Sequence, residues 1–242
     1  MGTAETDLVS ATTGAGYEET IFKVDEEVLG LGLTGVYFVM GNLRNRKSDE
    51  RFDALLADTL AGLPSFRSNE DFRSDPVLAG FRDLHTAVGR SNRENVASPE
   101  NLLRLIRRTG TLPRISLLVD IYNLVSLRTR LALGAHDLTA VDGDIRLTLT
   151  TGTERFVPLG ATEPRPVPAG EYGYIDGADE IICRMETRQV EKTKVVLDTT
   201  ECFYIVQGNR ATDADYVWDA ANELIALTKE FCGGDERILF GP

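Results

Sequence analysis

Apolar side chains recur at helical spacing between residues 117 and 130, and the rest of the chain is arranged around this segment. Its apolar positions fall at i, i+1, i+4, i+7 and i+8, which places them on one face of a helix. These positions are Leu117, Leu118, Ile121, Leu124 and Val125, and the opposite stripe carries Ser116, Asp120, Asn123, Ser126 and Arg130. The pattern predicts a helix with one buried face. The polar stripe is either solvated or forms one wall of a cleft.

Further helices are predicted before this segment and at the end of the chain. Each begins at a residue whose side chain commonly caps helix N-termini, and Pro76 stands at the first helical position of one of them. Residues 64–74, which carry Pro64 and Asn69, are predicted to form a loop. The predicted helices, each with its cap, are 48–63 (Ser48), 75–89 (Asp75), 98–110 (Ser98) and 213–234 (Asp213).

The second half of the chain is rich in short β-forming runs. Residues 34–42 also predict a strong strand, and residues 21–33 a short strand followed by a helical turn. The later predicted strands are 145–149, 156–160, 171–176, 180–185, 193–199 and 202–206. The sequence contains no long linker and no repeat. It therefore predicts one α/β (α+β) domain over residues 20–242, with mixed β-sheets flanked by helices, after a disordered tail over residues 1–19.

Composition excludes several classes of protein. The net charge of −12 argues against nonspecific binding to DNA or to membranes, and no run of apolar residues is long enough to span a bilayer. The three cysteines, Cys183, Cys202 and Cys232, are far apart and odd in number, which predicts buried thiols rather than disulfides or a zinc site. These features predict a cytoplasmic protein without a membrane partner.

Residues 101–130 are positively charged, in contrast to the negative net charge of the whole chain. This segment holds six arginines and one acid, Asp120. Planar guanidinium groups match phosphate oxygens, so these arginines are candidates for contacts with nucleic acid. The alternative is that they pair with acids elsewhere in the chain. The six are Arg104, Arg107, Arg108, Arg114, Arg128 and Arg130.

Common catalytic and cofactor motifs are absent from the sequence. Gly30, Gly32 and Gly35 match the spacing of a dinucleotide-binding loop, but they lead into a strand instead of a helix. The chain contains no GxSxG motif, no phosphate-binding loop and no metal-ligand spacing, so we predict no cofactor and no metal. His85 is a lone histidine inside the predicted helix 75–89 and is predicted to be structural or solvated.

Several segments of the chain, taken together, resemble a known domain. LPRISLLVDIYNLVSLRTRLALGAHDLTAVDGDIRL, FVPLG, PAGEYGYID, ICRMETRQVEKTKVVLDTT and the closing helix with its CGG end resemble the B3/B4 domain, which is the editing module of the phenylalanyl-tRNA synthetase beta subunit. They are even more similar to free-standing relatives of this module. The resemblance covers most of residues 20–234, and no other synthetase domain is present.

The resemblance implies a pocket that receives the aminoacylated 3′ end of tRNA and hydrolyses a wrongly attached amino acid. It places Asn123, from the family's VD-x-x-N segment, together with His136, Glu186 and Asp137 in the catalytic site. It implies substrate-binding roles for Tyr122, Ser126, Arg184 and Arg188. Free-standing relatives carry a tryptophan-rich run where this chain has Met185, Glu186, Thr187 and Arg188.

The sequence therefore leaves three candidate functions. The first is a deacylase that acts on mischarged aminoacyl-tRNA, with the tRNA 3′ end as its partner. The second is an enzyme acting on a free aromatic amino acid, such as a Pictet–Spengler-type condensation with a carbonyl compound; the altered 185–188 run and the acidic composition favour it. The third is a non-catalytic tRNA-binding module.

Overall fold

Aromatic side chains fill the space between two β-sheets. The ring of Phe22 lies 4.5 Å from that of Tyr37 and 5.2 Å from that of Phe203, and Tyr37 lies 5.9 Å from Tyr174. In each of these three pairs the two residues belong to different sheets, so this aromatic cluster is the shared core of the domain. The computed structural model describes residues 17, 19–63, 66 and 68–242, and every contact below belongs to these residues.

Sheet A has the strand order β1-β4-β5-β6-β7 within the described chain. β1 is parallel to β4, and the other neighbouring pairs are antiparallel. Its strands are β1 (Phe22–Val24), β4 (Ile145–Leu149), β5 (Tyr172–Ile175), β6 (Ile181–Arg184) and β7 (Arg188–Gln189).

Sheet B has the strand order β3-β8-β2-β9, and all of its pairs are antiparallel. Its two central strands are completely or almost completely buried, as expected for a sheet that is covered on both faces. The strands are β2 (Thr34–Gly41), β3 (Ala132–Asp137), β8 (Cys202–Gly208) and β9 (Asp235–Phe240).

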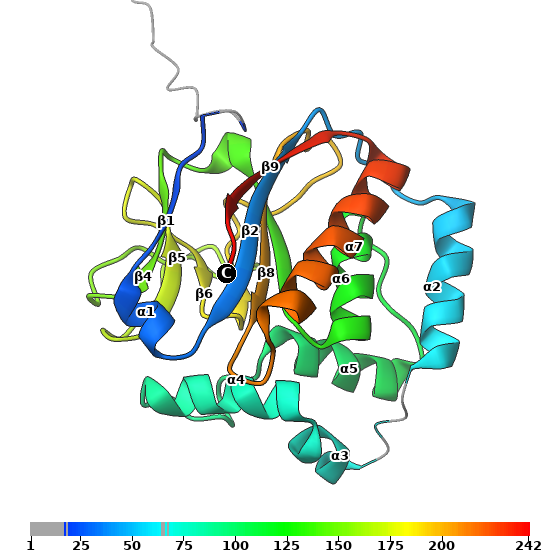
Figure 1. The fold of residues 1–242 in the computed structure, drawn as a ribbon. Coiled ribbons are helices and arrows are strands. Elements are labelled where there is room, and N and C mark those ends of the chain that lie inside the picture. Colours follow the sequence, from blue (N-terminus) through cyan, green and yellow to red (C-terminus); the bar gives the residue numbers. More distant parts are fainter. Residues whose placement is uncertain (1–16, 18, 64–65, 67) are drawn as a thin grey trace, which may run out of the picture.

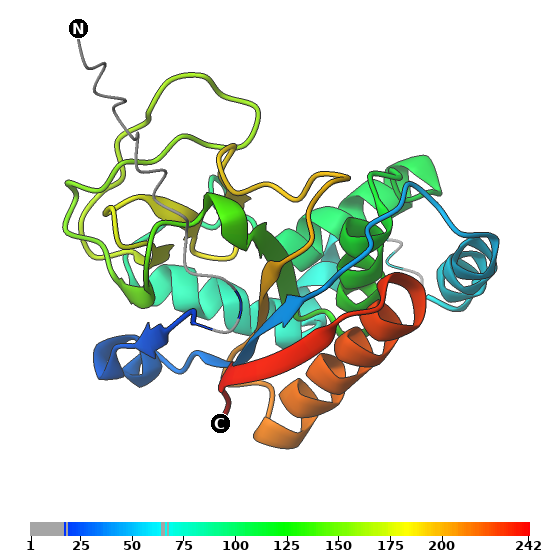
Figure 2. The same ribbon diagram turned by 90° about the horizontal axis from the view of Figure 1, so that it is seen from above.

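Helices cover the face of sheet B that points away from sheet A (Figure 1). α6 and α7 lie on this face, α2 lies outside α6, and α4 passes beneath one end of both sheets (Figures 1 and 2). The helices are α1 (Glu26–Gly30), α2 (Glu50–Gly62), α3 (Asn69–Ser74), α4 (Pro76–Ala87), α5 (Ser98–Thr109), α6 (Leu117–Thr129) and α7 (Ala214–Cys232), and a short 3₁₀ turn covers Leu138–Ala140.

The fold confirms the predicted mixed α/β class. The side chain of Asp75 caps α4 and that of Asp213 caps α7, as predicted, and Gly110 ends α5 in the left-handed conformation. The three cysteines are free and buried. Residues 1–16 and 18 of the predicted tail lie outside the described residues, and the domain boundary at residue 20 stays a prediction.

Several predicted elements are wrong. Asp49 caps α2 in place of Ser48, and Ser98 is the first residue of α5 instead of its cap. Residues 156–160 form one isolated bridge, between Pro158 and Val190, because Pro158 has no N–H for a ladder. Residues 193–199 form a turn in which the Thr199 hydroxyl accepts a hydrogen bond from Val196 N at 2.9 Å. The strands β3, β7 and β9 and the helix α3 were not predicted.

The central helix α6 is buried on more sides than its pattern predicts. It packs against β3 on one side and against α2, α5 and α7 on others. Asp120 and Ser126, from the predicted polar stripe, are therefore buried, and each has a partner inside the protein. Asn123 is half-buried and faces the cavity described next.

Candidate active site

A cavity of about 160 Å³ lies where α6, the edge strand β3 and the β6–β7 end of sheet A meet. Its walls are largely apolar, with Tyr122, Tyr174 and Ile205 among them. Its polar groups include Asn123, Glu186, Arg188 and Gln207. An apolar cavity with a few convergent polar groups is the usual form of a small-molecule site.

Glu186 enters the cavity from a tight turn between β6 and β7. The turn is closed by a hydrogen bond from Thr187 N to the carbonyl oxygen of Arg184, at 3.2 Å. Met185, the residue before Glu186, has a φ of 49°, a left-handed conformation that is costly for a non-glycine residue. Its side chain is completely buried, and this burial offsets the strain. The buried Met185 thereby fixes the direction of Glu186.

The carboxylate of Glu186 is 2% exposed and is held on both oxygens. Oε1 contacts Nε2 of His85, and Oε2 accepts hydrogen bonds from the Tyr172 hydroxyl and from Nε2 of Gln207, the latter at 3.2 Å. Burial of an unpaired carboxylate would be very unfavourable, and these partners compensate for it. A pre-positioned, desolvated carboxylate is the clearest chemical feature of the cavity.

His85, which was predicted to be a lone structural or solvated histidine, has an acidic partner from a distant segment. It lies on α4, is completely buried, and has Glu186 as its partner. Burial by itself lowers the pKa of His85, but the hydrogen bond and the charge of Glu186, with help from Asn92, raise the pKa above its ordinary value of 6.5. The pair had no local signal in the sequence.

The polar groups continue from Glu186 into the aromatic core. Gln207 of β8 accepts a hydrogen bond of 2.6 Å from the Tyr174 hydroxyl, which itself lies 3.4 Å from the hydroxyl of Tyr37. Burial raises the pKa of Tyr172, Tyr174 and Tyr37, so these phenols remain neutral donors. The network therefore joins both sheets behind the cavity.

The residues assigned by the family resemblance separate into two groups. Glu186, Asn123, Tyr122 and Arg188 line the cavity together. The others have structural partners in this conformation, so their proposed roles stay predictions. Ser126 Oγ donates to Leu131 O at 2.8 Å, and Arg184 makes a bidentate ion pair with Glu171 at 2.6 and 2.7 Å.

His136 and Asp137 belong to the end of β3. The His136 ring is completely buried, with Nδ1 2.8 Å from the Thr193 hydroxyl, and burial lowers its pKa to about 3. The Asp137 carboxylate accepts hydrogen bonds from Thr139 N and from the Thr199 hydroxyl, at 3.0 and 2.6 Å. In this conformation, both residues hold the segment 193–199 that precedes β8, and Asp137 also holds the turn that follows β3.

A second hollow adjoins the cavity and shares Thr187 and Arg188 with it. Arg165, Arg184 and Arg188 line it, and Glu94 is the acid among the lining residues. Arg165 and Arg188 are exposed. This hollow places positive charge beside the cavity in a chain whose net charge is −12.

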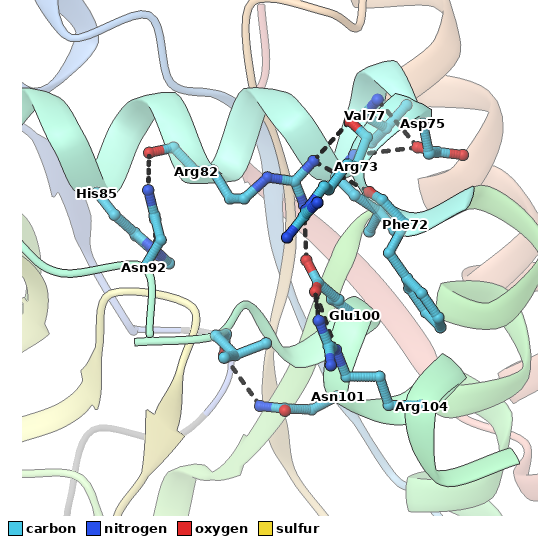
Figure 3. Close-up of polar contacts among 12 residues, drawn as sticks. Phe72, Arg73, Asp75, Val77, Arg82, His85, Asn92, Glu100, Asn101 and Arg104 are labelled. Atoms are coloured by element: carbon cyan, nitrogen blue, oxygen red, sulfur yellow. Dashed lines mark hydrogen bonds and ion pairs between the residues drawn. The ribbon is translucent and has the colours of Figure 1, made fainter. Parts of the chain in front are cut away.

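Most of the six arginines between residues 101 and 130 are engaged with acids. This is the alternative that the sequence left open, and a role in binding nucleic acid stays a prediction. Arg107 contacts the Phe72 ring, and Arg108 is exposed. Four of the arginines form ion pairs: Arg104 with Glu100 (Figure 3), Arg114 with Asp120 and Asp53, Arg128 with Glu223, and Arg130 with Asp75.

One group of carboxylates in the described chain has the spacing of a metal site. Oxygens of Asp142, Asp176 and Glu180 lie within 4.8 Å of one another. The ammonium group of Lys192 contacts all three, at 2.6, 3.2 and 2.7 Å. A lysine thus supplies the positive charge that such a group requires.

No helix among the described residues is long and apolar enough to cross a membrane.

The model of the B3/4 domain family matches residues 81–233, which include the second half of α4, the cavity and α7. The chain belongs to the B3/4 domain family. A crystal structure of an N-terminal fragment of the phenylalanyl-tRNA synthetase beta subunit from Pyrococcus horikoshii is similar to this B3/4 domain, with a TM-score of 0.50 and 17% sequence identity. The similarity covers 94% of this chain and 53% of that fragment, so the chain spans about half of its length. Comparison with curated protein sequences gives no match.

Proposed function

We propose that this B3/4 domain hydrolyses the ester between an amino acid and the 3′ end of a mischarged tRNA. One observation carries the proposal: the cavity that holds a buried carboxylate opens beside a hollow lined by arginines. An aminoacyl ester needs both, because its amino acid is small and partly apolar whereas its nucleotide end is a polyanion. Thr187 and Arg188, which line both spaces, would lie at the ester itself.

The roles of the residues follow from this placement. The side chain of the amino acid would fill the apolar part of the cavity, beside Tyr122 and Tyr174. The amide of Asn123 can donate a hydrogen bond to the ester carbonyl, and Arg188 can contact the adjacent phosphate. Glu186 would accept a hydrogen bond from the substrate or from the attacking water. Water adds to the carbonyl carbon, and the ribose oxygen leaves with a proton.

The test is a panel of tRNAs, each charged with a correct or an incorrect amino acid. The proposal predicts rapid release of at least one incorrectly attached amino acid and slow release of its correctly attached counterpart. Hydrolysis at the background rate across the panel would overturn it. Binding of uncharged tRNA without turnover would instead indicate a non-catalytic tRNA-binding module.

A second candidate is an enzyme that acts on a free amino acid, for example in a condensation with a carbonyl compound. The observation that favours it is the pairing of four of the six predicted phosphate-binding arginines with carboxylates. A ligand that binds the folded state raises the midpoint of thermal unfolding. A large shift with a free aromatic amino acid, combined with no tRNA hydrolysis, would favour this function over the first.

A further inference from the structure

The two ring nitrogens of His85 both face hydrogen-bond acceptors. Nε2 contacts the carboxylate of Glu186, and Nδ1 lies 3.2 Å from Oδ1 of Asn92. The orientation of the Asn92 amide follows from its other contacts, since its nitrogen donates to the Arg82 carbonyl oxygen at 3.2 Å (Figure 3). The same nitrogen donates to the Thr86 hydroxyl at 3.2 Å. A neutral imidazole has only one N–H, whereas an imidazolium has two. This arrangement fits an imidazolium, which donates to both acceptors when the Glu186 carboxylate is ionised.

The carboxylate of Glu186 has one acceptor position left for a ligand. Its two oxygens offer about four acceptor positions. Oε2 uses two of them for the Tyr172 hydroxyl and the Gln207 amide, and Oε1 uses one for His85. The remaining position is on Oε1, beside His85. A ligand donor that meets Glu186 is therefore sensitive to the proton on His85.

The other ionisable groups around the pair are neutral or have their own partners. Burial, reinforced by the charge of Glu186, raises the pKa of Tyr172 on β5 and of Cys183 on β6, so both stay protonated near neutral pH. On the α4 side, Arg82 pairs with Glu100, and Arg90 and Arg184 both pair with Glu171. Arg188 lines the cavity and adds a fixed positive charge at its mouth. The proton on His85 is then the variable charge next to Glu186.

We propose that His85 and Glu186 act as one proton-coupled unit that sets the charge of the cavity floor and so selects the ammonium group of the substrate. The pair has no net charge while His85 is an imidazolium, and carries one negative charge when His85 is neutral. A cationic ligand binds more tightly when the pair is negatively charged. Its affinity therefore rises as the pH increases and His85 loses its proton. By linkage, the bound cation lowers the pKa of His85. This inference rests on the proposed function, because an aminoacyl ester carries such an ammonium group.

The experiment uses the fact that the chain has two histidines. Nuclear magnetic resonance of the protein labelled with ¹⁵N-histidine follows both imidazoles from about pH 5.5 to about pH 8.5, the range in which histidines usually titrate. His136, whose pKa burial lowers to about 3, serves as a reference that stays neutral. The expected midpoint of His85 lies above 6.5, with both ring nitrogens protonated below it. A midpoint at or below 6.5 would overturn the proposal.

Two ligands of nearly equal shape test the selection of charge. 2-Phenylethylamine is a cation over this pH range, and 2-phenylethanol is neutral. The dissociation constant of the amine is expected to fall at least about tenfold across the titration of His85, with a downward shift of the His85 midpoint, whereas the alcohol should change less than about twofold. Equal pH dependence of the two ligands, or no binding of the amine at millimolar concentration, would contradict the proposal.

Two variants separate a charge effect from a structural one. Glu186→Gln keeps the shape and removes the charge, and it should move the His85 midpoint below 6.5 because burial, the largest effect on this pKa, then outweighs the contact with Asn92. Asn92→Ala removes the acceptor at Nδ1 and should lower the midpoint by a smaller amount. If Glu186→Gln does not fold, the comparison of the two ligands and the titration of His85 in Asn92→Ala still test the proposal. If no tRNA is hydrolysed but the His85 midpoint lies above 6.5 and responds to the two ligands as expected, the proposed function is overturned and the proton-coupled unit is supported.

Discussion

The imidazole of His85 contacts the carboxylate of Glu186, although 101 positions separate them in the chain. α4 supplies the histidine and the β6–β7 turn supplies the glutamate, so the contact exists only when the helical half and the strand-rich half have folded together. Both side chains are almost completely buried. A buried, charged contact between distant segments at a cavity is a common property of functional sites, and several predictions depend on it.

Glu186→Gln should lower kcat/KM for aminoacyl-tRNA hydrolysis by at least about 100-fold, because the acceptor of the substrate or water proton loses its charge. Steady-state rates on the preferred mischarged tRNA provide the measurement. Glu191→Gln is a matched control, since Glu191 pairs with Lys194 near the surface and does not line the cavity. Equal losses in the two variants would show that Glu186 has no special role.

Arg188→Ala should raise KM for aminoacyl-tRNA by about tenfold and leave kcat nearly unchanged, because a charge-assisted contact to phosphate at the mouth of the cavity is lost while Glu186 and Asn123 stay in place. Affinity measured against salt concentration should show a smaller slope than in the native protein. Arg108→Ala is the control, since Arg108 is also an exposed arginine but lies on α5. If Arg108→Ala has the larger effect, the RNA lies along α5 instead of in the hollow.

Gly134→Ala tests the width of the cavity. A Cβ at Gly134 would lie 2.7 Å from Nε2 of Gln189, so the Gln189 amide must move, and it is the flexible end of its side chain. We expect a change in unfolding free energy below about 1 kcal/mol but at least about fivefold weaker binding of an aromatic ligand. Urea unfolding and calorimetric titration measure the two effects. Gly62→Ala, where a Cβ meets nothing within 4 Å, should leave ligand binding unchanged.

His136 should make the fold sensitive to acid. Its folded-state pKa of about 3 lies below the ordinary value of 6.5, so only the unfolded chain takes up a proton between these pH values. Stability is therefore lost as pH falls below 6.5, by about 2 kcal/mol between pH 7 and pH 5 for this group. Urea unfolding of the native protein and of His136→Leu isolates the contribution. An equal loss in both proteins would contradict this assignment.

The raised pKa of His85 has the opposite effect on stability. Its contribution is complete below 6.5 and is lost as pH rises through the folded-state value, which lies above 6.5. The stability advantage of the native protein over Glu186→Gln should therefore shrink between pH 6.5 and pH 9. A constant advantage over that range would show that His85 is not charged in the native state.

Local signals predicted the elements that local interactions determine. The capping side chains of Asp75 and Asp213 mark the starts of α4 and α7 because a cap acts within one helical turn. β2 was predicted because β-forming residues are concentrated in it. β3 was missed because Ala132, Gly134 and Ala135 have little strand propensity, and its stability comes from pairing with β8, about 70 positions later.

The candidate site was only half accessible from the sequence. Glu186 and Asn123 were reached through the family resemblance, since their own neighbours in sequence give no chemical signal. His85 was assigned a structural role because its acid lies in another element, and the hollow with Arg165 was not anticipated because its arginines come from separate loops and strands. Contacts between distant segments carry most of the chemistry in this protein.

The most direct test of the central claim compares two esters of one amino acid. The preferred mischarged tRNA and the ethyl ester of the same amino acid share the group that would enter the cavity, but only the tRNA can occupy the arginine-lined hollow. We expect kcat/KM to be at least about 100-fold higher for the tRNA ester, and Glu186→Gln to abolish both reactions. Equal values for the two esters, or no hydrolysis of the tRNA ester, would contradict it.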